Sequence, residues 1–419
     1  MLANFSRDFI FCQWMLAHAS LKSINVPMHL TQTSITTDAS PIAVPEAAST
    51  ATPKLQAKWV GLQELRVHKK AWDALAENAL WRNASFESNY LLPALEHLAT
   101  ESVRVMVVER FAANNQSCLV AVVPFVEKRV YRLPFKAIEV WKHDQSFDAT
   151  PLLSKNFAPF AWQSICEKLI ADKYVLLSLD TVLAESRLDL VLRNAETKLG
   201  IVRFQRDHFQ RAAFTPDQTV ESYTKKHVSK SLRKNTGRLL RRLEDIGTVS
   251  WETSDSSSDY GQLAEDFLRI EASGWKEKEG TALLSNDSTS AFYRQLIRES
   301  AFDGKARFLS FKLDGRPIAM LSDIQTGPCV YSYKTAYDDE YSAFSPGQQV
   351  ELKNLEFLHR DGIELGDSCT STSNSTINRI WGQKLAFQNL ILSLTPGLAR
   401  TAVKALPLVQ SAVHRLRKN

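Results

Sequence analysis

Four tyrosines, a lysine and three acidic residues gather in one short segment of the chain, and a Pro-Gly pair follows them. Residues 331–341 read YSYKTAYDDEY, and Ser345, Pro346 and Gly347 come shortly afterwards. The Val, Tyr and Thr residues in 329–336 predict a strand, and the Pro-Gly pair predicts the start of a helix. Because the free N–H groups and the dipole of a helix start favour an anion, this strand, loop and helix predict a phosphate site.

The flanking sequence supplies the elements that would position such a site. Residues 305–313 and 316–325 predict two strands joined at Asp314-Gly315, since Asp-Gly between apolar runs is a strong hairpin signal. After the helix, residues 362–366 predict a further short strand that ends in the carboxylate of Asp367. The predicted order is helix, helix, three strands, loop, helix and strand.

This order and its residues resemble the Gcn5-related N-acetyltransferase (GNAT) superfamily. The chain is most similar to its cellulose-biosynthesis (CelD-like) branch, which is related to the FemAB peptidoglycan aminoacyltransferases. The resemblance covers about residues 220–395 by motif and residues 58–215 by the order of elements. The matching positions are Trp275 in EASGWK, the AFYR run at 291–294, LDGRPIA at 313–319, Lys334, Tyr337, Asp338, Tyr341, Ser345-Pro346-Gly347, Asp367 and Trp381-Gly382.

The resemblance implies a site in which acetyl-coenzyme A, or another acyl-coenzyme A, meets an acceptor. It implies that Tyr331, Tyr333, Ser345, Gly347 and Gln348 hold the coenzyme. Acyl transfer also needs a polarised carbonyl and removal of a proton from the acceptor. The catalytic residues expected for these steps are Asp367, Lys334, Asp338, Tyr337 and Tyr341.

Each of these residues also has a structural interpretation. Gly347 could serve an ordinary helix-start turn, and Lys334 could be an edge residue whose ammonium reaches water. Asp338 and Asp367 could be a loop cap and a strand-end turn residue, and the tyrosines could simply pack. Asp367 is the favoured base because it ends a strand at the expected mouth of the site.

The acceptor side of the site is expected to include Trp275, Asn378 and Trp381, and here the chain departs from its branch. Relatives tend to have a glycine-containing loop and a Tyr-Lys pair just before Trp-Gly. This sequence has TSTSNST at 370–376, and Ile377-Asn378 replaces the Tyr-Lys pair. The lost lysine leaves open a catalytically silent binding or scaffold protein in polysaccharide or envelope assembly.

The most basic stretch, residues 225–242, predicts an amphipathic helix with a positive outer side. A solvated helix face is the favoured interpretation. The alternative is a docking surface for coenzyme A or for the aminoacyl-tRNA that the FemAB relatives use as donor.

Length and composition place the chain among globular proteins without a metal. The 419 residues predict two domains, and the net charge of +5 does not itself indicate nucleic acid. Five scattered cysteines without a Cys-x-x-Cys pair argue against a zinc site and favour a reducing, cytoplasmic location. No apolar run approaches the ~20 residues of a membrane span, and the apolar run at 9–17 is too short and interrupted to predict a secretory signal.

The sequence therefore predicts an α/β (α+β) fold of two tandem GNAT-like lobes, with mixed, mostly antiparallel sheets flanked by helices. The expected divisions are a disordered N-terminal segment and linker (1–57), an N-terminal lobe (58–215), a C-terminal acyltransferase lobe (216–395) and a basic tail (396–419). The predicted activity is transfer of an acyl group from acyl-coenzyme A to an amine or hydroxyl acceptor, such as a small molecule or polysaccharide precursor.

Overall fold

The computed structural model describes residues 53–111, 117–129, 136–274, 280–370 and 376–416. The strands are β1 (Leu55–Val60), β2 (Val103–Phe111), β3 (Ser117–Arg129), β4 (Lys136–Val140), β5 (Leu152–Leu153), β6 (Tyr174–Leu183), β7 (Val202–Phe214), β8 (Val249–Thr253), β9 (Ala306–Leu313), β10 (Arg316–Thr326), β11 (Cys329–Tyr337), β12 (Leu365–Asp367) and β13 (Gln383–Ser393). The α-helices are α2 (Leu62–Val67), α3 (Lys69–Glu77), α4 (Ser88–His97), α5 (Ala158–Ala171), α6 (Arg187–Lys198), α7 (Val220–His227), α8 (Lys230–Glu244), α9 (Tyr260–Ala272), α11 (Asp287–Phe302), α12 (Pro346–Arg360) and α13 (Leu398–Leu416). Four 3₁₀ turns are η1 (Ala84–Phe86), η2 (Leu283–Ser285), η3 (Asp339–Phe344) and η4 (Ile377–Arg379).

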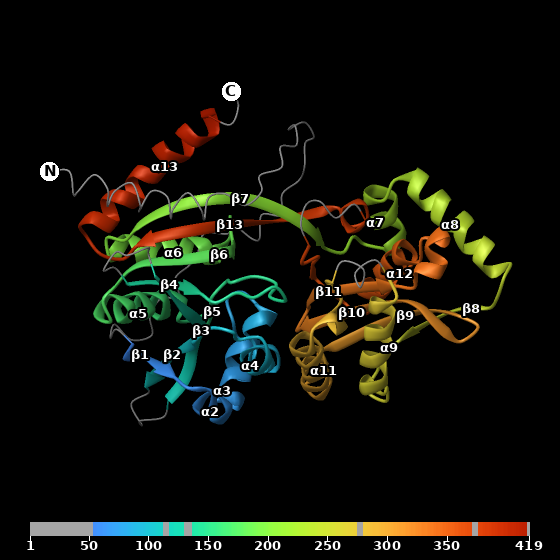
Figure 1. Cartoon of the computed structure of the whole chain (residues 1–419), viewed down its shortest axis with the longest axis horizontal. Helices are drawn as coiled ribbons and strands as arrows, with labels where there is room; N and C mark the ends of the chain where they lie inside the picture. Colours follow the sequence, from blue (N-terminus) through green and yellow to red (C-terminus); the bar gives the residue numbers. More distant parts are fainter. Residues whose placement is uncertain (1–52, 112–116, 130–135, 275–279, 371–375, 417–419) are drawn as a thin grey trace.

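Within the described ranges the strands form one mixed sheet that runs through two lobes (Figure 1). Its order is β1-β2-β3-β4-β6-β13-β7-β12-β11-β10-β9-β8, and β5 pairs with β3. The β4–β6 and β11–β12 pairs are parallel, and the other pairs are antiparallel. The predicted α/β class with a mixed, mostly antiparallel arrangement is confirmed, and the two lobes share a single continuous sheet.

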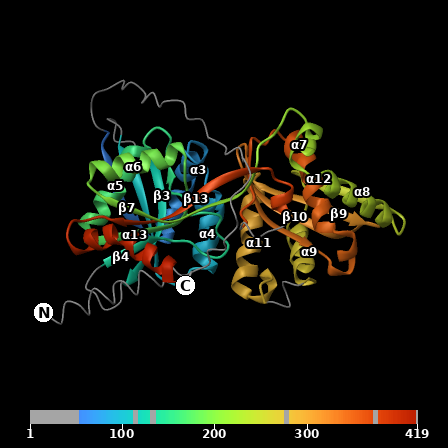
Figure 2. The same ribbon diagram turned by 90° about the horizontal axis from the view of Figure 1, so that it is seen from above.

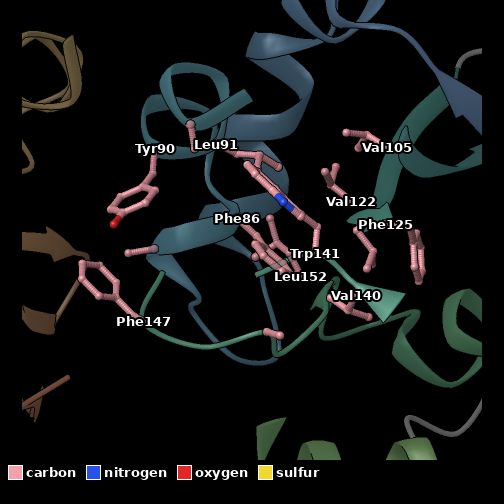
Figure 3. Close-up of a cluster of buried hydrophobic side chains, with 14 of the residues drawn as sticks. Phe86, Tyr90, Leu91, Val105, Val122, Phe125, Val140, Trp141, Phe147 and Leu152 are labelled. Carbon is pink, nitrogen blue, oxygen red and sulfur yellow. The ribbon is translucent and has the colours of Figure 1, made fainter. Parts of the chain in front are cut away.

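The first lobe, made of β1–β6 and α2–α6, is built on strands that are buried on both faces. In β2, the consecutive residues Val105, Met106, Val107 and Val108 are all buried, which requires cover on both sides of the sheet. Helices α3 and α5 both pack against β3. Figure 3 shows the resulting apolar core, in which Phe86, Trp141 and Leu152 lie against side chains of β2, β3 and β4.

The second lobe, made of β8–β12 and α7–α12, contains the elements that the sequence predicts around the site. The hairpin of β9 and β10 turns at Asp314 and Gly315, whose φ angles of 48° and 79° suit the Asp-Gly pair. Helices α9 and α11 cover one face of this part of the sheet, and α8 and α12 lie on the other (Figure 1). The basic stretch forms α7 and α8, and Leu232, Leu239 and Leu243 bury the inner side of α8 as predicted.

Strands β7 and β13 run between the two lobes (Figure 2). β13, which follows the second lobe in sequence, lies between β6 and β7 and pairs with both along most of its length. The far end of β7 pairs with β12 through Phe214 and Ala213. The helix after β13, α13, packs Ala399, Val403 and Leu406 on the sheet.

Polar contacts also join the lobes. Glu87, at the start of α4, is buried and forms an ion pair of 2.7 Å with Lys305 of the second lobe. Asn89 donates to the hydroxyl of Ser300 at 2.9 Å. In the described part of the chain, none of the helices is long and apolar enough to cross a bilayer.

Candidate active site

A β-bulge in β11 marks the centre of the candidate site. Ser322 of β10 pairs with Lys334, and Ile324 pairs with Tyr331. Asp323 alone therefore faces two residues of β11, Ser332 and Tyr333. Such a bulge turns side chains out of the regular alternation and is common beside active sites. Here it directs Tyr333 and the adjacent Lys334 toward α11 and α9, on the same side of the sheet.

The bulge coincides with the point at which β11 loses its neighbour. β12 pairs with β11 only through Cys329, Val330 and Tyr331. Beyond Tyr331, no described strand pairs with β11 on the side away from β10. The backbone of residues 332–337 can therefore bind an extended ligand on this edge, as added strands do in other complexes.

The loop after β11 leads into α12 through a strained residue. Ser345 has φ = 52°, and Pro346 is the first residue of α12. Gln348 and Gln349 donate their N–H groups to the carbonyl of Ser345 at 3.0 and 3.1 Å. Among the described contacts of this turn, the N–H of Gly347 has no backbone acceptor, so it is the group that could bind an anion.

Gly347 has a second reason to be glycine. A Cβ at this position would lie 3.1 Å from Cδ1 of Tyr337, so the tyrosine ring packs directly on the helix start. Burial raises the pKa of the Tyr337 hydroxyl. The structure therefore brings two predicted site residues, Tyr337 and Gly347, into direct contact.

Lys334 belongs to a charged pair beside the bulge. Its Nζ lies 3.3 Å from Oε1 of Glu271 on α9. Glu271 is only 2% exposed, and its Oε2 accepts a hydrogen bond from the N–H of Leu283 at 2.9 Å. The pair holds the lysine ammonium in place at the open edge of β11.

Tyr331 and Tyr333 lie at the junction of the lobes. The Tyr331 hydroxyl donates to the carbonyl of Arg82, and its ring stacks on Phe147 at a centroid distance of 5.1 Å. The Tyr333 hydroxyl donates to Oε1 of Gln145 at 2.8 Å. Burial raises the pKa of both hydroxyls well above the usual value. These tyrosines link the first lobe to the bulge.

Asp367 is placed near this junction but is held by other groups. It is 2% exposed and forms a buried ion pair with Arg211 of β7, and its Oδ1 accepts from the N–H of Cys369 at 3.0 Å. Nearby Asp148 is also buried, and burial raises its pKa to about 6. These contacts favour a structural role for Asp367, while the predicted catalytic role stays a prediction.

Asp338 and Tyr341 lie in the loop between β11 and α12. Oδ2 of Asp338 accepts from Arg316 at 2.7 Å, and its Oδ1 accepts from the N–H of Glu340 at 3.1 Å, which caps η3. Tyr341 packs in the apolar cluster that includes Phe344. Both residues therefore have structural contacts close to the start of α12.

The predicted acceptor residues are not gathered at the bulge. Trp381 is fully buried, and a Cβ on Gly366 would lie 2.9 Å from its ring, so it forms part of the core under β12. Asn378 accepts from Nζ of Lys384 at 3.4 Å. Trp275 and most of the 370–376 loop lie outside the described residues.

Lys384, Glu271 and Gln145 are candidate site residues that the sequence does not single out. Lys384 comes from β13 and brings an ammonium to the position next to Asn378, where the branch has a lysine. Burial lowers its pKa. Glu271 is signalled only by its place in the EASGWK motif, and no local pattern marks Gln145. In the described part of the chain, no group of three His, Cys, Asp or Glu side chains could hold a metal ion.

Comparisons with known proteins agree with this geometry. Residues 230–374 match the family model of the acetyltransferase (GNAT) domain. The fold is similar to the crystal structure of FemX, with a TM-score of 0.51 and 12% identity over 84% of this chain and 99% of that one. It is also similar to a conserved protein of unknown function from Bacteroides thetaiotaomicron, with a TM-score of 0.50 and 9% identity over 82% of this chain and 100% of that one. No curated protein matches the sequence. The second lobe thus has a GNAT acyltransferase-type fold.

Proposed function

We propose that the chain transfers an acyl group from acyl-coenzyme A to an amine or hydroxyl acceptor at the open edge of β11. The observation that supports this most is the bulge at Ser332 and Tyr333, at the point where β12 stops pairing with β11. The extended arm of the coenzyme would pair with the free backbone edge, and its pyrophosphate would meet the N–H of Gly347. The match of residues 230–374 to the GNAT acetyltransferase domain supports the same class of reaction.

Lys334 and Glu271 are the side chains that we expect to act on the reacting groups. An ammonium held beside the bulge can stabilise the negative charge that develops on the thioester oxygen. The acceptor attacks the thioester carbon, the carbon–sulfur bond breaks, and the acceptor proton leaves through a base. Glu271, Asp338 and Asp367 are the carboxylates available for that proton, each already bound to a cation.

Release of free thiol from acetyl-coenzyme A tests this proposal. The wild-type protein should release coenzyme A thiol when amine acceptors are present. Lys334→Met should reduce the rate by about 10²-fold or more if the ammonium stabilises the oxyanion. The matched control is Lys353→Met, which removes a lysine paired with Glu356 on α12. Tight coenzyme binding without thiol release would instead favour a silent scaffold.

The main alternative is an aminoacyl-tRNA donor, and helix α8 decides between the two. Lys230, Lys234, Arg238, Arg241 and Arg242 are exposed, and in the described structure none of them pairs with a carboxylate. Their side chains could contact phosphates, because α8 packs beside η3 and α12. If tRNA binds here, affinity should fall steeply with salt, since each phosphate contact releases counterions. We expect a filter-binding titration to be flat, which would leave α8 as a solvated face.

A further inference from the structure

A cavity of about 530 Å³ opens at the opposite end of the second lobe from the first turn of α12. The ends of β8 and β10, the start of β9 and the C-terminal half of α12 form its walls. Its volume lies within the range of roughly 300–1,000 Å³ that is usual for small-molecule sites. It is separate from the open edge of β11 that the proposed transfer uses.

A buried carboxylate lines this cavity with one oxygen unsatisfied. Asp323 is 3% exposed, and among the described groups its Oδ1 has no hydrogen-bond partner. Its other oxygen accepts weakly from Nδ2 of Asn354 at 3.5 Å, and the Ser332 hydroxyl also bonds the carboxyl group. A buried acceptor without a partner costs free energy. A ligand that donates a hydrogen bond to Oδ1 would recover it.

The charges around Asp323 argue against a charged ligand. Arg307, on β9, lies close enough to stabilise the ionised form of Asp323. Its guanidinium is fixed by Gln325 at 3.0 Å and by Asp361 at 2.9 Å. An ammonium ligand would be repelled by this guanidinium, and an anion would be repelled by Asp323. The cavity therefore favours a neutral hydrogen-bonding molecule.

The remaining lining adds apolar surface to these polar groups. Phe308, Leu309 and Phe357 line the same cavity as Asp323, Arg307 and Asn354. A molecule with hydroxyl groups at its rim and an apolar ring face matches this mixture, since apolar walls bind the body of a ligand and a few polar groups orient it. Saccharides have this combination.

We propose that this cavity is a binding site for a neutral saccharide of one or two rings, with a ligand hydroxyl donating to Oδ1 of Asp323. Arg307 would donate to a saccharide oxygen at the mouth. The site needs no acyl donor, so its presence or absence is independent of the proposed transfer reaction.

The test is a calorimetric or NMR titration of the full chain with D-glucose and cellobiose, with glucosamine as the cationic comparison. We expect at least one neutral sugar to bind, and Asp323→Leu to weaken binding roughly tenfold or more through loss of a charged hydrogen bond. Asp323→Asn keeps the side-chain shape and should weaken binding several-fold, because a charge-assisted bond is lost. This second variant serves if the leucine variant does not fold.

Glu351→Gln is the matched control. Glu351 is another buried carboxylate of α12 with an unsatisfied oxygen, but it does not line the cavity. Its replacement should leave sugar binding unchanged. Failure of both neutral sugars to bind, binding of glucosamine alone, or full sugar affinity in both Asp323 variants would each overturn the proposal.

Discussion

Asp367 and Arg211 form a buried charge pair whose two members stand on strands that meet at the lobe junction. Arg211 is 4% exposed, and its other end group donates to the carbonyl of Phe147 at 2.8 Å. Its guanidinium also lies 3.9 Å from the ring centre of Phe387. Loss of the carboxylate would leave a guanidinium with little to compensate its charge in the protein interior.

We therefore expect Asp367→Asn to lower the free energy of unfolding by about 3–5 kcal/mol, the usual cost of removing one partner of a buried pair. Urea denaturation measures this change. The double variant Arg211→Met/Asp367→Asn should recover part of the loss, since no charge is then left unpaired. Unchanged stability together with a steep loss of acyl transfer would instead identify Asp367 as the catalytic carboxylate that the sequence predicts.

Gly347 connects a residue property to coenzyme binding. Gly347→Val should lower coenzyme A affinity at least tenfold, which is about 1.4 kcal/mol, because its side chain would occupy the approach to the helix start. Gly347→Ala adds only the Cβ at 3.1 Å from Tyr337 and should have a smaller effect. Isothermal calorimetry measures both affinities.

The Tyr337 ring must be separated from this effect. In Gly347→Val/Tyr337→Leu the contact with the ring is relieved, and we expect the affinity to stay low. Recovery of binding in the double variant would mean that the glycine serves Tyr337 packing. Unchanged affinity in a folded Gly347→Val protein would exclude the proposed phosphate site.

At the scale of elements, helix α12 carries a carboxylate into the core. Glu351 is 2% exposed, and its Oε1 accepts from the Thr335 hydroxyl of β11 at 2.7 Å. Burial is the main cause that raises its pKa from 4.5 to about 8. The folded state therefore holds a proton that the unfolded state releases, so this group's contribution to stability is present below about pH 4.5 and is lost as the pH rises through 8.

Glu351→Gln should remove this loss. At about pH 8.5 the variant should be more stable than the wild type by roughly 1–3 kcal/mol, since each unit of pKa shift corresponds to about 1.4 kcal/mol. Near the lower end of the window the two proteins should be equally stable. Thermal or urea unfolding of both proteins across this range provides the comparison. A difference that does not change with pH would mean that Glu351 is not protonated in the fold.

Elements whose structure depends on neighbouring residues could be predicted from the sequence. The Asp314-Gly315 turn needs two positive φ angles that this pair adopts readily, and the hairpin is confirmed. The strand that ends at Tyr337 and the helix that begins at Pro346 are confirmed for similar reasons. Residues 65–80 were expected to form one helix, but the chain forms two, α2 and α3, which meet at His68.

Features that depend on distant partners could not be predicted. The ion pair of Arg211 and Asp367 joins residues 156 positions apart, and the contact between Lys384 and Asn378 depends on where β13 enters the sheet. β7 was predicted only at residues 201–204 but continues to Phe214, because its polar residues pair with β13 rather than follow an apolar pattern. The bulge in β11 arises from its register with β10, which no local signal specifies.

At the scale of the whole molecule, β13 determines whether the predicted lobes can exist apart. It comes from the sequence after residue 382, yet it is hydrogen-bonded to β6 and to β7 in the sheet. Phe387 of β13 is fully buried with Leu183 of β6 and Ala213 of β7. A fragment that ends at residue 215 would expose the edges of both strands and lose part of their shared core.

We expect residues 53–215 alone to be insoluble or not cooperatively folded, because two long unpaired strand edges promote aggregation. Adding residues 383–393 to this fragment through a flexible linker should restore a soluble, cooperative unfolding transition. Circular dichroism and thermal unfolding of the two proteins measure this. The control carries the same linker and strand with Leu385, Phe387 and Leu390 replaced by serine, which removes the buried side of β13, and it should behave like the fragment without a strand. Cooperative folding of residues 53–215 alone would show that the first lobe is an independent domain, with β13 added to a sheet that is already stable.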